Sequence, residues 1–326
     1  MERGDTRAPA PAPLALDVAL APLLLARDPA RMARTVFIVV DVIRATTTLC
    51  VLFERGCPRV EVAGSIAAAR AAAQRGHDAA PPDQPPPLLA GEMGGLAPAD
   101  FDHGNSPVEF ASLDLRGRTV IFATTNGTRA LHACAGGAAV LAGAFRNASA
   151  VARAAVAQAS QLAAPEPPSP APAPASNAAS ETLAAAADDG EPDGPGIVIV
   201  CAGRDQHPAY DDTLCAGYLA LAVERAAAAV GRAITRANGA RIAIAAARTM
   251  LREGGIRAAL GESGAGQAIA AVGLAADLDW CAEVDVCPHV PAVMAAGSDD
   301  GLLAVRAWTP GRARRRQGAR FTAGRE

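Results

Sequence analysis

Five short apolar runs, separated by alanine-rich stretches, constrain the fold of this 326-residue chain more than any other feature. The runs are rich in β-branched residues, as expected for strands that are covered on both faces. They span residues 35–40, 60–63, 119–123, 138–144 and 196–202. The stretches between and after them predict helices at 46–55, 65–75, 128–135, 147–160 and 212–230. This alternation predicts an α/β fold with a mainly parallel sheet flanked by helices.

The rest of the chain adds elements at both ends of this pattern. A first strand is expected around Leu14 to Leu20, and a closing strand at 301–308. Residues 238–255 and 264–284 have helical patterns. Two polar residues stand where helices are expected to begin, so we predict Ser65 and Asn147 as helix caps.

Composition divides the chain into two halves, at 14–160 and 196–308, with most of the polar loops in the first. Between them, residues 161–195 form a proline-, alanine- and serine-rich tract with almost no large apolar side chain. Such a tract cannot bury enough surface to offset its ordering entropy, and we predict a disordered insertion. We also expect a disordered N-terminus at 1–13 and a solvated basic tail at 309–326.

Charge and cysteine content exclude several classes of protein. The net charge is −3 and all 30 basic residues are arginine, which offers no general basic surface for nucleic acid. No apolar run is long enough to span a bilayer. Seven cysteines without a C-x-x-C pair are typical of buried thiols in a reducing cytoplasm, not of disulfides or a zinc site. We expect a cytoplasmic protein without nucleic-acid or membrane partners, and homo-oligomerisation is compatible with the sequence.

Polar, glycine-bearing segments follow three of the predicted strands, and a fourth lies in the loop at 91–107. In open α/β sheets, ligands bind beyond the carboxyl ends of the strands, so we expect these four segments to form one site. The candidate residues are Asp41, Arg44, Thr46, Thr47, Glu92, Asp102, Asn105, Ser106, Thr124, Thr125, Asn126, Gly127, Thr128, Arg204, Asp211 and Asp212.

These residue types indicate a phosphorylated ligand and a hard cation. Hydroxyls and backbone amides of a turn such as "TTNGT" at 124–128 suit phosphate oxygens, and Arg44 can bind an oxyanion with two N–H groups. Carboxylates are the oxygen ligands that Mg²⁺ takes together with water and substrate phosphate. Asp41, Glu92, Asp211 and Asp212 are therefore the candidate metal ligands.

Each feature also has a purely structural interpretation. Asp41 could cap the following helix and pair with Arg44, and "TTNG" is a good turn by itself. Asp211 and Asp212 could be charges at a helix N-terminus, where they are favourable. From the residues alone, these alternatives stay open.

Common phosphate-binding motifs are missing. A P-loop requires a lysine, and the chain contains none. Phosphatases that form an aspartyl-phosphate usually have a second aspartate two residues after the first, where this chain has Ile43. The segment "GESGAGQA" at 261–268 lacks the spacing of a dinucleotide-binding loop.

An ordered set of motifs resembles a known family. The segments are "VDVIRATTTL" (40–49), "GE" (91–92), "FDHGNSP" (101–107), "TTNGTRAL" (124–131), "RNASAVA" (146–152), "DDTLCAG" (211–217) and "GLAADLDWCAEVD" (273–285). In this order they are similar to the 2-phosphosulfolactate phosphatases of coenzyme M biosynthesis. The resemblance covers roughly residues 14–308 without the insertion, and "GRDQHPAYDD" (203–212) departs from the family's usual approach to its acidic pair.

The resemblance implies a three-layer α/β fold and a Mg²⁺-dependent hydrolysis of (R)-2-phospho-3-sulfolactate to sulfolactate and phosphate. We expect Asp41, Glu92 and one of Asp211 or Asp212 to hold the metal, and Arg44 with residues 124–127 to hold the phosphate. Asn105 and Ser106 would orient the substrate, and Asp102 is the candidate general base. Alternatives are a covalent aspartyl-phosphate at Asp41, another small phosphorylated acid as substrate, or a protein that binds an oxyanion without catalysis.

Overall fold

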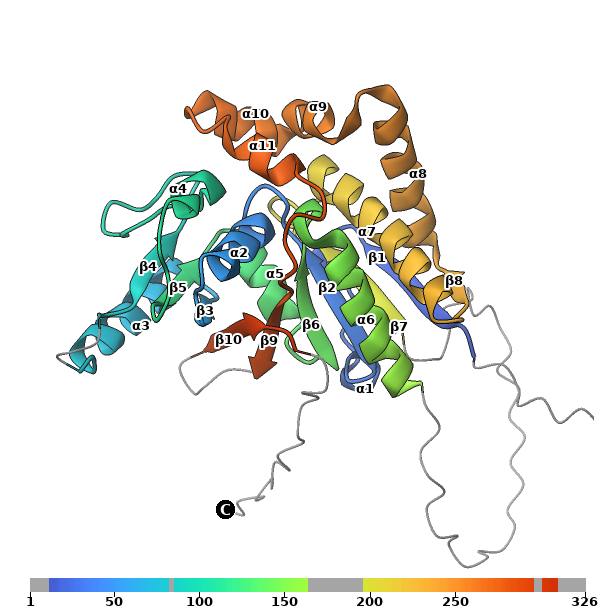
Figure 1. Ribbon diagram of the computed structural model, residues 1–326, viewed down its shortest axis with the longest axis horizontal. Helices are drawn as coiled ribbons and strands as arrows, with labels where there is room; N and C mark the ends of the chain where they lie inside the picture. Colours follow the sequence, from blue (N-terminus) through green and yellow to red (C-terminus); the bar gives the residue numbers. More distant parts are fainter. Residues whose placement is uncertain (1–11, 82–84, 164–195, 296–300, 310–326) are drawn as a thin grey trace, which may run out of the picture.

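A single sheet of ten strands organises the molecule, with the order β4-β5-β3-β10-β9-β6-β2-β7-β1-β8 (Figure 1). The computed structural model describes residues 12–81, 85–163, 196–295 and 301–309. The strands are β1 (Leu14–Ala19), β2 (Thr35–Val40), β3 (Arg59–Ala63), β4 (Leu88–Gly91), β5 (Thr119–Ala123), β6 (Ala139–Gly143), β7 (Gly196–Cys201), β8 (Ile234–Arg236), β9 (Pro291–Ala295) and β10 (Leu302–Ala307).

Helices connect these strands and cover the sheet. They are α1 (Pro29–Met32), α2 (Ala45–Glu54), α3 (Ile66–Asp78), α4 (Pro107–Ala111), α5 (Gly127–Ala133), α6 (Ala148–Leu162), α7 (Tyr210–Ala229), α8 (Asn238–Glu253), α9 (Gly255–Glu262), α10 (Gly264–Ala271) and α11 (Asp277–Ala282), with 3₁₀ turns η1 (Pro22–Leu24) and η2 (Phe145–Asn147). In the described part of the chain, no helix combines the length and apolarity needed to cross a membrane.

The sheet has two parallel blocks joined by an antiparallel pair. β6, β2, β7, β1 and β8 form the larger block, and β4, β5 and β3 form the smaller one. β9 and β10 lie between the blocks and pair antiparallel with each other and with both neighbours. The two blocks consequently run in opposite directions along the hydrogen-bonded ladder. Strand twist, roughly 20–25° at each step, turns one block across the other.

Both faces of the larger block are covered, which gives the expected three layers. In β2, Val36, Ile38 and Val40 pack with α6 and α7, while Phe37 and Val39 pack with α2 on the opposite face. Every residue of β2 is buried, so a continuous apolar run is the pattern this position requires. In Figure 1, α2 lies between the two blocks, and α9, α10 and α11 lie together at the top of the molecule.

Most predicted elements are confirmed, with boundaries that differ by a few residues. Ser65 caps α3 by accepting a hydrogen bond from the Ala68 amide (3.1 Å). Asn147 precedes α6, but its side chain bonds to backbone groups of Ala142, Ala144 and His289 instead of to the helix.

Three strands, β4, β8 and β9, are absent from the sequence prediction, and the helix expected at 264–284 is divided into α10 and α11. All seven cysteines are free and buried, as predicted. The predicted disordered segments fall mainly on residues 1–11, 164–195 and 310–326, outside the described residues.

Candidate active site

The turn between β2 and α2 is held by the three consecutive threonines. Thr46 Oγ1 donates to the carbonyl of Asp41 (2.9 Å), and Thr47 Oγ1 donates to that of Val42 (2.9 Å). Thr48 Oγ1 donates to the carbonyl of Asn105 (3.2 Å) and links this turn to a distant loop. All three side chains are fully buried. The prediction that Thr46 and Thr47 bind substrate is therefore replaced by a structural role, because their hydroxyls are already bonded to the backbone.

Glu92 follows β4 and shapes the loop beside this turn. Its carboxylate accepts hydrogen bonds from the amides of Gly95 (2.8 Å) and Thr125 (2.7 Å). Gly94 and Gly95 have positive φ angles, which permits the tight turn from Met93 to Leu96. Glu92 therefore ties the loop after β4 to the loop after β5.

In the segment after β5, only part of the predicted binding turn lines the cavity described below. Thr124 and Thr128 bond to each other's backbone and close the start of α5. Thr125 and Asn126 line the cavity described below. At Gly127, a Cβ atom would lie 2.6 Å from Asp41 Oδ2 and 2.6 Å from the Ala45 Cβ. Gly127 thus allows the two loops to approach each other, a different role from ligand binding.

The two adjacent aspartates at the start of α7 are used differently. Asp212 accepts from the amide of Val42 through Oδ1 (2.9 Å) and from that of Gly203 through Oδ2 (3.0 Å), so it joins the ends of β2 and β7. No such backbone bonds to other segments occupy the Asp211 carboxylate among the described residues. Of the pair, Asp211 is the better candidate for a metal ligand.

These segments enclose a cavity of about 390 Å³. Its polar wall follows the ends of β2, β4, β5 and β7, so residues from both blocks of the sheet meet there. Its opposite wall comes from α10, through Gly264, Ala265, Ala268 and Ile269. The predicted site residues in the lining are Asp41, Arg44, Glu92, Asn105, Thr125, Asn126, Arg204, Asp211 and Asp212.

Asp102 does not lie in this cavity. Its side chain is exposed and accepts a hydrogen bond from the Leu89 amide (2.8 Å), which fixes its own loop against β4. The general-base role expected of Asp102 has no support in this geometry, because the carboxylate lies away from the cavity lining.

Ser106 also lies outside the lining. It caps α4 by accepting from the Glu109 amide (3.2 Å) and donates to Asp277 (2.5 Å).

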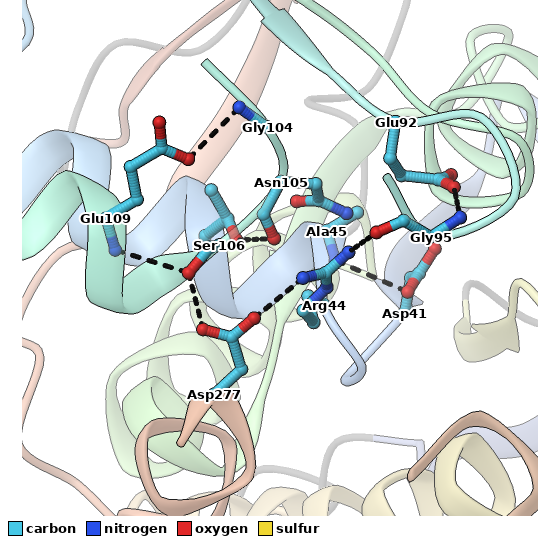
Figure 2. A network of polar contacts seen from close by, with 11 residues as sticks. Asp41, Arg44, Ala45, Glu92, Gly95, Gly104, Asn105, Ser106, Glu109 and Asp277 are labelled. Atoms are coloured by element: carbon cyan, nitrogen blue, oxygen red, sulfur yellow. Dashed lines mark hydrogen bonds and ion pairs between the residues drawn. The ribbon is translucent and has the colours of Figure 1, made fainter. Parts of the chain in front are cut away.

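The arrangement also contains residues that the sequence analysis missed. Asp277, the first residue of α11, accepts a hydrogen bond from Arg44 Nη1 (2.7 Å) as well as from Ser106 (Figure 2). It stands within the family-like segment 273–285, yet nothing local distinguishes it from the neighbouring Asp279. Likewise, the glycine-rich segment 261–268 supplies α10 to the cavity wall.

Burial and neighbouring negative charges raise the pKa values of the aspartates in the cavity wall. The pKa of Asp41 is raised to about 7, first by burial and then by nearby Glu92 and Asp211, against the opposing effects of the Ala45 amide and Arg44. Burial likewise raises the pKa of Asp211 to about 6, with Arg204 opposing. The pKa of Asp212 is also raised, first by burial and then by Asp211 and Asp41. A cation would relieve this repulsion.

The donor chemistry fits a hard divalent cation only in part. Across the described ranges, no three His, Cys, Asp or Glu side chains stand close enough to hold a metal ion by themselves. Mg²⁺, however, is commonly bound by one or two carboxylates, with water and substrate phosphate completing the shell. Asp41, Asp211 and Glu92 provide such oxygens around one cavity.

The fold and the cavity define a class: a three-layer α/β protein with an acidic, arginine-bearing cavity beyond the ends of its strands. The chain matches the 2-phosphosulpholactate phosphatase family over residues 24–164 and 175–295, which is more than half of its length. It belongs to this family.

Individual relatives agree with this membership. The chain is 35% identical over 261 residues to a Deinococcus radiodurans protein named "Probable 2-phosphosulfolactate phosphatase", covering 79% of this chain and 88% of the relative. A Thermus thermophilus protein of the same name is 35% identical over 257 residues, covering 78% and 86%. A shorter match to a Parasynechococcus marenigrum protein, also of that name, is 42% identical over 106 residues, covering 32% and 41%.

Proposed function

We propose that this protein is a Mg²⁺-dependent phosphomonoester hydrolase that converts (R)-2-phospho-3-sulfolactate to sulfolactate and phosphate, a step of coenzyme M biosynthesis. One observation carries the proposal: every residue that lines the cavity lies within the segments matched to the family. The substrate is taken from the family description and the relatives' names, and the residues of the cavity suit its phosphate.

The residues of the cavity have two kinds of role: most would bind the phosphate or the metal, and one would accept a proton. Arg44 would bind the phosphate, and Asn105, Thr125 and Asn126 would contact the remaining oxygens. Asp41, with a pKa of about 7, is suited to accept a proton from attacking water near neutral pH, and we assign it the base role in place of Asp102. Mg²⁺, when bound by Glu92 and Asp211 beside Asp41, would neutralise phosphate charge and activate the water whose proton Asp41 accepts.

Phosphate release from 2-phospho-3-sulfolactate and from a panel of other small phosphorylated acids tests this proposal. We expect turnover with Mg²⁺, loss of turnover with EDTA, and at least about 100-fold slower turnover in Asp41→Asn, the typical contribution of a general base. Turnover that is unaffected by EDTA and by Asp41→Asn would contradict the metal-assisted mechanism. Binding without turnover of any compound would indicate an oxyanion-binding protein.

A single turnover in ¹⁸O-labelled water tests for an intermediate on Asp41, and the stereochemical course at phosphorus completes the test, because direct attack inverts the configuration and two successive displacements retain it. Direct attack places the label in the released phosphate, and so does attack of water on the phosphorus of an aspartyl-phosphate, so this outcome is assigned by the stereochemistry. Label found in the Asp41 carboxylate would instead show that Asp41 acts as the nucleophile.

A further inference from the structure

Arg44 is buried but faces the cavity, so its orientation decides what it can bind. Its side chain is 3% exposed. Nη1 donates to Asp277 Oδ2 (2.7 Å), and Nη2 donates to the carbonyl of Gly95 (2.6 Å). A guanidinium has five N–H donors in a fixed plane, so these two bonds set the direction of the remaining ones.

Asp277 is the only charged partner of Arg44 among the ion pairs of the described residues. It is 1% exposed and does not line the cavity. Its second oxygen accepts from Ser106 Oγ (2.5 Å). Both oxygens are thus bonded to protein groups, and Asp277 can influence a ligand only through them.

Through its bond to Ser106, Asp277 also holds the segment that carries Asn105. Ser106 follows Asn105, which is 4% exposed and lines the cavity. No other described residue bonds to the Asn105 side-chain amide, and its Oδ1 is buried without a partner. Phosphate oxygens only accept hydrogen bonds, so the part of this amide that can contact a phosphate is its Nδ2 group, whereas the unpaired Oδ1 requires a donor such as a water or a ligand hydroxyl.

Asp277 also connects the C-terminal helices to the loops that carry Arg44 and Ser106. It begins α11, which packs against α9 and α4, while α9 packs against α10 on the cavity wall. Figure 2 shows its carboxylate between Ser106 and Arg44, directed at both. One side chain from the C-terminal helices therefore fixes two groups that the β2–α2 turn and the loop before α4 present to the ligand.

We propose that Asp277 is a positioning residue for the reaction, which holds the Arg44 guanidinium and, through Ser106, the Asn105 amide in the orientation that binds the phosphate of the substrate. The inference rests on the proposed function only in that the cavity accepts a phosphate. A purely structural alternative is that Asp277 anchors α11 and has no effect on the ligand beyond folding.

Binding of inorganic phosphate, measured by calorimetry with Mg²⁺ present, tests the proposal without requiring turnover. We expect Asp277→Asn to weaken phosphate binding about 10- to 100-fold, the scale of one misaligned charge-assisted hydrogen bond. Asp279→Asn is the matched control, because Asp279 lies on the same helix, is 68% exposed and pairs with Arg257. The control should bind phosphate like the wild type.

A double-mutant cycle with Arg44→Lys separates positioning from folding. If Asp277 acts through Arg44, most of the effect of Asp277→Asn disappears in the Arg44→Lys background. A full and additive loss in that background, or wild-type affinity in a folded Asp277→Asn variant, overturns the proposal. If Asp277→Asn does not fold, Asp277→Glu provides the same test, since it keeps the charge but displaces the carboxylate by one methylene.

The outcomes also separate this inference from the proposed function. A protein that binds phosphate with the expected dependence on Asp277 but hydrolyses no phosphomonoester would retain the inference and lose the function. A wild type that binds no phosphate would overturn the positioning role. Where turnover is present, Asp277→Asn should lower kcat/KM more than Asp279→Asn does, with each variant assayed well below its own unfolding midpoint, because breaking the buried pair with Arg44 also lowers the midpoint of Asp277→Asn.

Discussion

At the scale of single residues, neighbouring side chains of identical chemistry have different roles. Asp211 and Asp212 are adjacent, both buried, and both carry a raised pKa. Asp212 uses its two oxygens to bond the amides of Val42 and Gly203. The orientation of successive residues at a helix start decides this difference, and no sequence pattern distinguishes the two.

The contrast predicts opposite effects on stability. Asp212→Ala leaves two buried amides without acceptors, so it should lower the free energy of unfolding by about 2–4 kcal/mol. Asp211→Ala removes a carboxyl group whose ionisation burial disfavours, so stability should stay unchanged or rise while Mg²⁺ binding weakens. Urea unfolding at neutral pH with EDTA measures both. Equal losses in the two variants would contradict the assignment.

At the scale of elements, the sequence predicted the strands and helices whose bounds depend on neighbouring residues. The run at 35–40 has the bounds of β2 because all six residues are apolar or buried and Asp41 follows. β4 was missed because it is four residues long and follows a proline-rich stretch. The opposite direction of the two blocks depends on pairing through β9 and β10, which short sequence windows do not encode. Asp277 escaped notice for the same reason: its partners lie 233 and 171 residues away.

Close packing of α7 against α8 gives a prediction at this scale. A Cβ atom at Gly217 would lie 1.9 Å from the carbonyl oxygen of Ala243 in α8. Gly217→Ala should therefore separate the helices, lower stability by about 1–3 kcal/mol or more, and displace the start of α7 that carries Asp211. Gly261→Ala in α9 is the control, because only the flexible end of Arg257 lies near (3.3 Å). Thermal unfolding and Mg²⁺ affinity should change in the first variant only.

At the scale of the whole molecule, the cavity lies where both blocks of the sheet meet helix α10. Its carboxylates come from the ends of strands that are distant in sequence, so folding brings like charges together. No disulfide joins any of the seven cysteines. Non-covalent packing alone therefore offsets this repulsion. Functional sites commonly lower the stability of the fold, here through repulsion between buried carboxylates.

The pH dependence of stability should reveal this cost. The ordinary pKa of an aspartate is 3.8, whereas folded Asp41 keeps its proton up to about pH 7. Between these values the folded state binds more protons than the unfolded state, so stability decreases as pH rises. Asp211 adds a contribution of the same sign up to about pH 6. His132 opposes it near pH 6.5, because burial lowers its pKa.

Without metal, we therefore expect the free energy of unfolding to decrease by roughly 2 kcal/mol between about pH 5 and about pH 7. Under the proposed function the ionised carboxylates hold Mg²⁺, so added Mg²⁺ should raise the unfolding midpoint more at pH 8 than at pH 5. Asp41→Asn should flatten the pH profile and reduce the Mg²⁺ effect, whereas the exposed-site variant Asp279→Asn should reproduce the wild type. A metal-free profile that rises with pH, or a Mg²⁺ effect that persists unchanged in Asp41→Asn, would show that the charge collected in this cavity is not what the cation neutralises.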